Sequence, residues 1–143
     1  MRVVLDTNVV VAAMRSHRGA SAELIRLAVR KQITLIGGLT LALEYIDVCS
    51  RPTTRERTNV AALDATRFAE EVIGLFEPVE IRFRWRPAGP DAGDDHVIET
   101  ALNGRADAVV TFNLRDFAEA SRRFGLPVLP PGGILRILES THE

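Results

Sequence analysis

The chain has 143 residues, enough to bury a substantial core, and we expect residues 1–143 to form a single domain. Its hydrophobic fraction of 46% and charged fraction of 26% are ordinary for a globular protein, and no apolar run is long enough to cross a membrane. A net charge of −1 excludes a global basic field. Cys49 is the single cysteine, which excludes an internal disulfide and favours a cytoplasmic protein.

The first element is a short apolar run, Val3–Leu5, which predicts a buried strand that ends at Asp6. Thr7 and Asn8 then form a turn before the apolar pattern resumes in a helix. Ligands of open α/β sheets bind at the carboxyl ends of the strands, so Asp6 is expected at the mouth of such a crevice. An Asx turn or a helix cap explains an isolated Asp at this position equally well.

Strands and helices alternate along the rest of the chain. This alternation predicts an α/β fold with a mostly parallel sheet and helices on both of its faces. The elements expected in the first half, after the first helix, are a helix capped by Ser21, a strand over 33–36, a helix over 39–49, a polar and mobile segment over 52–60 and a helix capped by Asp64. Those expected in the second half are a strand over 79–81, a helix that starts at Asp94 and ends at Gly104, a strand over 108–111, a helix over 116–124, a strand over 127–129 and a helix over 130–138.

Several acidic side chains are expected at one edge of this sheet. Asp6 follows the first strand, Glu44 lies within a helix, Asp94 stands at a helix start, and Asn113 and Asp116 follow a late strand. Carboxylates brought together repel one another unless a cation neutralises them, and hard oxygen ligands suit Mg²⁺ or Mn²⁺. Such a site activates water and clamps a scissile phosphate. The three histidines are scattered and have no zinc spacing.

Structural interpretations of these polar residues stand beside the functional ones. Glu44 on its own fits a solvated helix residue, and Asp116 fits an N-cap better than a direct metal ligand. Four further residues either support the ligands through hydrogen bonds or only form turns and caps; they are Thr7, Asn8, Asp91 and Thr111.

The segment RFRWR at 82–86 alternates basic and aromatic residues. If it is extended, its three arginines share one face and its two aromatics share the other. Arg82, Arg84 and Arg86 are then candidates for contacts with nucleic-acid phosphates, and Trp85 stacks on an unpaired base or packs against the protein. The competing interpretation is an edge strand with a solvated arginine face and buried aromatics.

Four stretches of the chain form an ordered set: VVLDTNVVV at Val3–Val11, LALEYIDVCSRP at Leu41–Pro52, DAGDDHVIETALNGRADAVVTFNLRDF at Asp91–Phe117 and LPVLPPGGIL at Leu126–Leu135. In their order and spacing they resemble PIN-domain ribonucleases, in particular the small toxins of toxin–antitoxin operons. The resemblance implies a PIN-like three-layer α/β/α sandwich and a divalent-metal-dependent endoribonuclease that uses Mg²⁺ or Mn²⁺. It further implies an RNA substrate, a cognate antitoxin protein that blocks the site, and a homodimer.

The same resemblance implies roles for individual residues. Asp6, Glu44 and Asp94 match the catalytic, metal-binding acids of the family. The fourth acidic position of many relatives falls here on Asn113, which adds no charge and would hold a metal through water, with Asp116 three residues on as a further candidate ligand. This departure implies a weaker second metal, or operation with one metal.

Three other functions compete with this interpretation. A haloacid-dehalogenase-like phosphatase needs a second Asp two residues after its nucleophile, and that position holds Asn8. A phospho-receiver domain needs a late Lys, and none follows Lys31. The third alternative is a PIN-like module that binds RNA or a partner protein without cleaving, which Asn113 leaves open.

Overall fold

The computed structural model describes residues 1–141 and has at its centre a five-stranded sheet in which every strand pair is parallel. The strand order is β3-β2-β1-β4-β5. Strand β1 (Arg2–Leu5) therefore lies in the middle, between β2 (Thr34–Gly37) and β4 (Ala108–Val110). The edges are β3 (Phe76–Pro78) and β5 (Val128–Leu129). Because the strands are parallel, all their carboxyl ends meet at one edge of the sheet.

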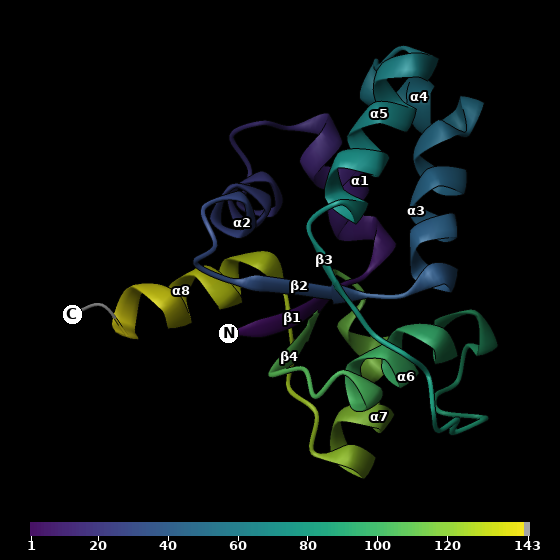
Figure 1. Cartoon of the computed structure of the whole chain (residues 1–143), viewed down its shortest axis with the longest axis vertical. Coiled ribbons are helices and arrows are strands. Elements are labelled where there is room, and N and C mark those ends of the chain that lie inside the picture. The colour runs from purple at the N-terminus through teal and green to yellow at the C-terminus, as the bar shows by residue number, and fades with distance from the viewer. Residues whose placement is uncertain (142–143) are drawn as a thin grey trace.

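Helices cover both faces of the sheet, which confirms the predicted α/β/α sandwich. Helices α1 to α5 lie on one side, and α6 and α7 on the other (Figure 1). Helix α8 packs against α2 and β5. The bounds are Thr7–Arg15 for α1, Ala20–Val29 for α2, Leu39–Ser50 for α3, Pro52–Thr58 for α4, Ala62–Ile73 for α5, Asp95–Asn103 for α6, Leu114–Phe124 for α7 and Pro131–Thr141 for α8, with a short 3₁₀ helix, η1, at Ala92–Asp94.

The first strand is buried on both of its faces. Val3, Val4 and Leu5 are almost completely shielded from solvent, as expected for a parallel strand covered by helices on both sides. At its carboxyl end the backbone N–H of Asp6 donates to the carbonyl of Val110 at 2.9 Å. The pairing of β1 with β4 thus continues until the chain turns into α1, and it brings the ends of these two strands together.

The third strand lies at 76–78, so the predicted strand at 79–81 was wrong. Phe76 pairs with Leu35, and its ring lies directly over Gly37 on the neighbouring strand. A Cβ atom on Gly37 would stand 2.4 Å from this ring, so the close packing depends on that glycine. A tertiary contact of this kind sets the strand register and leaves no periodic signal in the local sequence.

The polar segment at 52–60, predicted to be mobile and given no helix, is largely helical. Helix α4 begins at Pro52, which suits the first helical position because it has no N–H to leave unpaired. The helix ends at Asn59, whose backbone is left-handed with φ 56°. Asparagine tolerates this conformation better than most residues.

The predicted caps of three helices were also wrong. Ser21 and Asp64 lie inside the first turns of α2 and α5, whose capping residues make no side-chain bond. Asp116 lies in the first turn of α7, and Asn113 takes the capping position. Acids in a first turn still interact favourably with the helix dipole. Gly104 ends α6 as predicted, but with an ordinary helical backbone, and the left-handed residue is Arg105.

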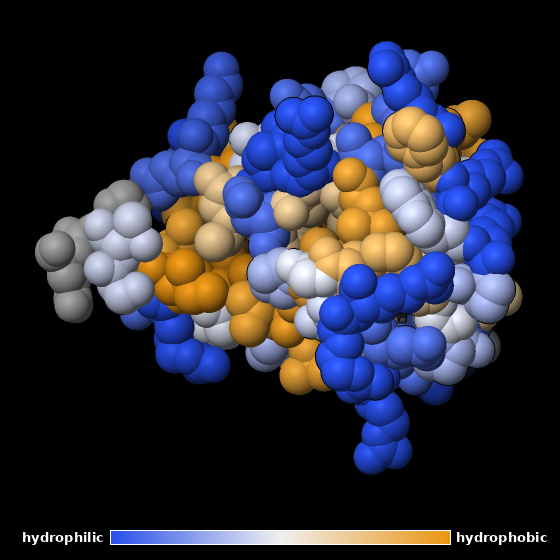
Figure 2. Space-filling model, turned by 90° about the horizontal axis from the view of Figure 1, so that it is seen from below, coloured by the Kyte–Doolittle hydropathy of each residue, from blue (hydrophilic) through white to orange (hydrophobic). Residues whose placement is uncertain are grey.

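None of the helices described over residues 1–141 is long and apolar enough to cross a membrane. Seen from below, the surface mixes charged and apolar side chains, and apolar ones gather toward the C-terminal end (Figure 2). Helix α8 lies at that end and exposes Ile137.

Candidate active site

Asp6 stands where β1 ends, buried at the meeting point with β4. One carboxylate oxygen accepts from the N–H of Thr7 at 2.8 Å, so Asp6 caps α1. The other oxygen accepts from the hydroxyl of Thr111 at 2.8 Å. Burial raises the pKa of Asp6, the bonds from Thr111 and Thr7 oppose this, and the charge of Glu44 adds to the increase. The capping role and the position in the crevice, considered as alternatives from the sequence, thus belong to the same side chain.

Glu44 lies on α3, and its neighbour Tyr45 fixes that helix against β1. The buried Tyr45 hydroxyl donates to the carbonyl of Leu5, the residue before Asp6. The hydroxyl of Thr7 donates to the Glu44 carboxylate, so Thr7 contacts both acids, one through its backbone and one through its side chain. Glu44 is therefore a half-buried residue beside Asp6 and not a solvated helix residue.

His96 on α6 is the functional candidate that the sequence analysis missed. Its Nε2 lies 3.4 Å from the Glu44 carboxylate. Burial alone would raise the pKa of Glu44, but the bonds from His96 and Thr7 outweigh it and lower that pKa. Burial likewise acts to lower the pKa of His96, and the contact with Glu44 raises it overall. The pair joins α3 to α6, which are far apart in the chain, so no local spacing in the sequence marks it.

Asp94 is the most strongly perturbed acid of the site. It ends η1, and its Oδ2 is buried with no hydrogen-bond partner among residues 1–141. Burial, followed by the charges of Asp6, Asp91, Asp116 and Glu44 in that order, raises its pKa from 3.8 to about 6. Asp94 therefore experiences the repulsion of all four other carboxylates. The next residue, Asp95, is buried in another direction and accepts from the N–H of Ala88 at 3.1 Å.

The geometry groups three carboxylates in a way that the sequence analysis did not anticipate. Oxygens of Asp91, Asp94 and Asp116 all lie within 4.8 Å of one another, close enough for one metal ion. Asp91 also accepts from the N–H of Gly93 at 2.8 Å, which is the turn-capping role expected for it. The Asn113 side chain donates to the Asp116 carboxylate and so orients this acid from the capping position of α7.

Thr111 and Asn8 connect the two halves of the acidic site. The backbone N–H of Asn113 donates to the Thr111 hydroxyl at 2.9 Å, and that hydroxyl in turn donates to Asp6. The Asn8 side chain lies 3.4 Å from both the Thr111 hydroxyl and the N–H of Phe112. These contacts attach the β4–α7 turn to the start of α1, so both turns are held beside the acids.

The chemistry of this donor set fits a divalent cation. Oxygen-only ligands in a partly open cluster suit Mg²⁺ or Mn²⁺. A buried carboxylate oxygen without a partner is unfavourable unless a cation or water satisfies it, and Asp94 Oδ2 is such an atom. Asp91, Asp94 and Asp116 are the closest candidate ligands, with Asp6 and Glu44 beside them.

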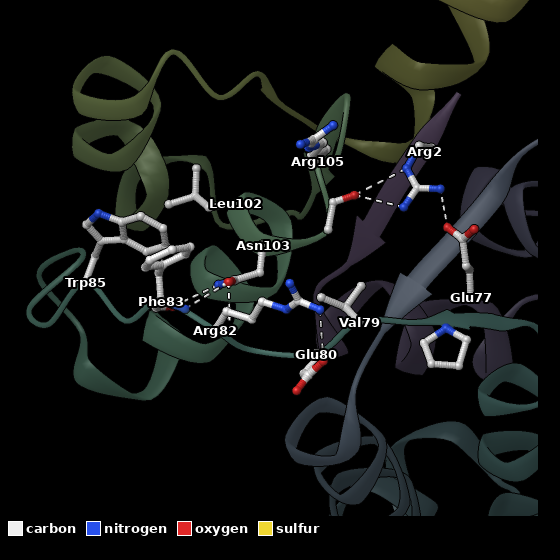
Figure 3. A pocket seen from close by; sticks show the side chains of 12 residues that line it. Arg2, Glu77, Val79, Glu80, Arg82, Phe83, Trp85, Leu102, Asn103 and Arg105 are labelled. Carbon is white, nitrogen blue, oxygen red and sulfur yellow. Dashed lines mark hydrogen bonds and ion pairs between the residues drawn. The ribbon is translucent and has the colours of Figure 1, made fainter.

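The RFRWR segment does not form a strand, and its arginines do not share one face. We call residues 79–90 the strap. Arg82 lines a cavity of about 610 Å³ between the strap and the C-terminal end of α6, and it pairs there with Glu80 at 3.5 Å (Figure 3). Arg84 and Arg86 line a different cavity, beside His96. Trp85 packs edge-on against Phe124, with ring centroids 5.8 Å apart, and so packs against the protein.

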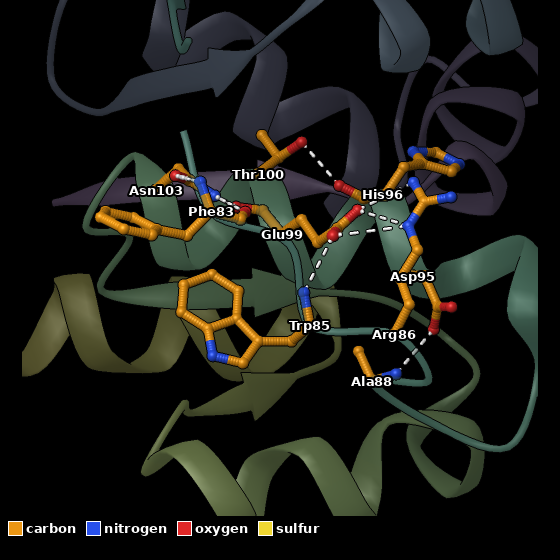
Figure 4. A network of polar contacts seen from close by, with 9 residues as sticks. All are labelled: Phe83, Trp85, Arg86, Ala88, Asp95, His96, Glu99, Thr100 and Asn103. Atoms are coloured by element: carbon orange, nitrogen blue, oxygen red, sulfur yellow. Dashed lines mark hydrogen bonds and ion pairs between the residues drawn. The ribbon is translucent and has the colours of Figure 1, made fainter. Parts of the chain in front are cut away.

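One face of α6 holds the strap in place, and this too was missed from sequence. Glu99 is buried and accepts from the N–H of Trp85 at 3.0 Å and from the Arg86 guanidinium at 3.0 Å (Figure 4). Asp95 one turn earlier and Asn103 one turn later also bind strap backbone. The spacing of four between Asp95, Glu99 and Asn103 places these polar residues on one face of α6, and it is the signal that could have revealed this role.

Comparison with protein families gives one match. The PIN domain profile matches residues 2–115 of the chain. The matched region contains Asp6, Glu44, Asp94 and Asn113 and ends one residue before Asp116. No curated protein matches the chain, and no solved structure does.

Proposed function

Because the chain belongs to the PIN-domain family, whose members are in general metal-dependent nucleases, we propose that it is a divalent-metal-dependent endoribonuclease. The observation that carries the proposal is Asp94 Oδ2, a buried and unpartnered carboxylate oxygen among the other acids. Asp94 is repelled by four neighbouring carboxylates, and a bound cation would neutralise this repulsion.

In this proposal Asp91, Asp94 and Asp116 hold Mg²⁺ or Mn²⁺, and Asp6 and Glu44 complete the acidic lining. When bound, such an ion polarises the scissile phosphate and makes a water molecule more acidic. Hydrogen bonds from Thr7 and Thr111 keep Asp6 oriented. The contact with His96 lowers the pKa of Glu44 and raises that of His96, so the pair favours an ionised Glu44 carboxylate facing His96 Nε2.

RNA is the proposed substrate, and the assignment to a toxin–antitoxin pair comes from the resemblance in the four sequence stretches. Within that assignment, a cognate antitoxin blocks the acidic site and the protein acts as a homodimer. Expression of the chain alone should arrest cell growth, and co-expression of the neighbouring antitoxin gene should restore it. Normal growth under strong expression of active enzyme would contradict the toxin role and leave the nuclease role intact.

The nuclease proposal is tested by incubating purified protein with single-stranded RNA and, separately, with DNA of the same sequence. We expect cleavage of RNA with Mg²⁺ or Mn²⁺, no cleavage with EDTA, and loss of cleavage in Asp6→Asn. The matched control is Asp64→Asn, an acid on the exposed face of α5 far from the site. Cleavage that survives both EDTA and Asp6→Asn would overturn the proposal.

A second candidate function is RNA binding without cleavage. Asn113 favours it, because an amide stands where many relatives carry an acid, and its side chain is engaged with Asp116. Tight RNA binding with no product under any divalent ion would support this alternative. Replacing Asn113 by Asp then tests whether the missing charge is the reason.

A further inference from the structure

A second cavity lies on the same edge of the sheet as the acidic site. It lies between the first turn of α3 and α6, the strap borders it, and its volume is about 190 Å³. We call it the α3–α6 pocket. Its walls include Leu39 and Thr40 from α3, Ile81 and Arg84 from the strap, and His96 from α6.

The α3–α6 pocket is continuous with the acidic site through one residue. His96 lines the pocket and also contacts Glu44. Asp6 follows β1, whereas the pocket begins at Gly38, where the adjacent strand β2 turns into α3. Neighbouring strands are about 4.8 Å apart, so Asp6 and the start of the pocket occupy adjacent positions on this edge of the sheet. One extended RNA strand can therefore contact both.

The pocket combines exposed apolar side chains with a positive charge that the protein does not neutralise. Leu39 is 76% exposed and Ile81 is 36% exposed, so both present apolar surface that a ligand in the pocket can cover. Arg84 makes no ion pair within residues 1–141, whereas its neighbour Arg86 is bound by the buried Glu99. An arginine side chain presents a planar guanidinium, on which unpaired RNA bases stack.

We propose that the α3–α6 pocket receives one unpaired base of the RNA, next to the phosphate that is cleaved, with Arg84 stacked on the base and Leu39 and Ile81 packed against it. The inference rests on the proposed nuclease function and adds the recognition of a single-stranded substrate. Pockets for drug-sized ligands measure about 300–1,000 Å³, so 190 Å³ suits a single planar ring.

The strap presents Arg84 from a fixed backbone. Asn103 accepts from the N–H groups of Arg82 at 2.9 Å and Phe83 at 3.0 Å, and it donates to the Phe83 carbonyl at 2.8 Å. Glu99 binds the N–H of the residue after Arg84. Arg84 is thus held on both sides by α6, and a preformed wall loses less conformational freedom on binding than a flexible one.

The test measures the affinity for short unpaired RNA by fluorescence anisotropy, with Asp6→Asn in every protein to prevent cleavage. We expect Arg84→Ala to weaken binding roughly three- to thirtyfold. The matched control is Arg67→Ala, the same change at an exposed arginine on α5 that has no role in the proposed site. Leu39→Ala should also weaken binding, and its control is Leu63→Ala, an exposed leucine on α5.

A second arm removes single bases from the RNA, one position at a time. In the protein with an intact pocket, one abasic position beside the cleavage site should weaken binding, and Arg84→Ala should abolish that positional effect. Equal losses for Arg84→Ala with intact and abasic RNA would show a contact with the backbone and overturn the base pocket. Equal affinities of Arg84→Ala and Arg67→Ala would overturn it as well. If wild-type protein neither binds nor cleaves RNA, the nuclease proposal fails. If wild-type protein cleaves RNA but Arg84→Ala leaves the affinity for RNA unchanged, only the pocket proposal fails.

Discussion

Tyr45 donates its buried hydroxyl proton to the carbonyl of Leu5, and these two residues directly adjoin Glu44 and Asp6. The contact joins α3 to β1 at the point where each carries an acid. This hydrogen bond between their sequence neighbours therefore helps to set the relative position of the two carboxylates, together with the bonds that Thr7 donates to both acids.

Replacing Tyr45 by Phe should reduce both stability and activity. Loss of one buried hydrogen bond costs about 1 kcal/mol of unfolding free energy. We expect RNA cleavage to fall severalfold as well, because Glu44 is then less firmly placed beside Asp6. Urea unfolding and initial cleavage rates measure the two effects. The control is Val72→Ala, a core truncation on α5 that lowers stability without touching α3–β1 bonding; equal activity of the two variants would contradict the positioning role.

Asp94 and Asp95 should behave oppositely despite being neighbours. Asp94→Asn should reduce cleavage by several orders of magnitude, because its charge belongs to the acidic cluster. Asp95→Asn should retain most activity, because the amide oxygen still accepts from Ala88 N–H. Cleavage assays on both proteins at saturating Mg²⁺ test this pair. The reverse pattern would show that Asp95 is the functional acid.

The metal-free protein should become less stable as pH rises through the titration of Asp94. The pKa of Asp94 is raised to about 6 in the folded state, against an ordinary value of 3.8, so the folded protein binds the proton more tightly. The resulting stabilisation is complete below pH 3.8 and is lost as pH rises to about 6. Asp94→Asn removes the repulsion between the ionised Asp94 and the neighbouring carboxylates.

In EDTA at pH 7.5, we therefore expect Asp94→Asn to unfold at a higher temperature than wild type. After allowance for solvent screening the gain is about 1 kcal/mol, or roughly 3 °C. Mg²⁺ should raise the melting temperature of wild type more than that of the variant. Thermal unfolding with and without Mg²⁺ measures both effects, and a variant less stable than wild type in EDTA would argue against repulsion in the cluster.

Replacing His96 by Gln should move the pH dependence of cleavage. The pKa of Glu44 is lowered by His96, so without the imidazole this carboxylate is protonated at a higher pH. We expect the acid limb of the rate profile to shift toward higher pH, with the loss of rate confined to the acid side of the profile. His17→Gln, in the exposed loop before α2, is the control. An unchanged pH profile would mean that the contact with His96 does not control the ionisation of Glu44 during cleavage.

The central strands were predictable from sequence because their burial leaves a direct pattern. Val3–Leu5 and the apolar run at 108–110 are continuous because both faces of those strands are covered. The third strand was misplaced because its register depends on the contact of Phe76 with Gly37, across two segments far apart in the chain. Helix α4 was missed because its polar sequence carries no amphipathic period.

The residues of the candidate site likewise divide into those that the sequence identifies and those that only tertiary contacts reveal. Asp6 was recognisable because it directly follows a buried strand, and Glu44 and Asp94 from their places in the family pattern. His96 could not be found in this way, since its importance comes from contact with a different helix. Likewise, the grouping of Asp91 with Asp94 and Asp116 depends on the path of the η1 turn and of α7.

Both edge strands of the sheet are very short. Strand β3 has three residues and ends at Pro78, and strand β5 has two residues. Proline cannot donate a ladder hydrogen bond, and so few exposed peptide groups give an incoming strand little to pair with. Two copies of this protein are thus poorly suited to join by extending one sheet into the next. A homodimer would have to form through helices and loops, and aggregation through strand addition would require β3 or β5 to lengthen first.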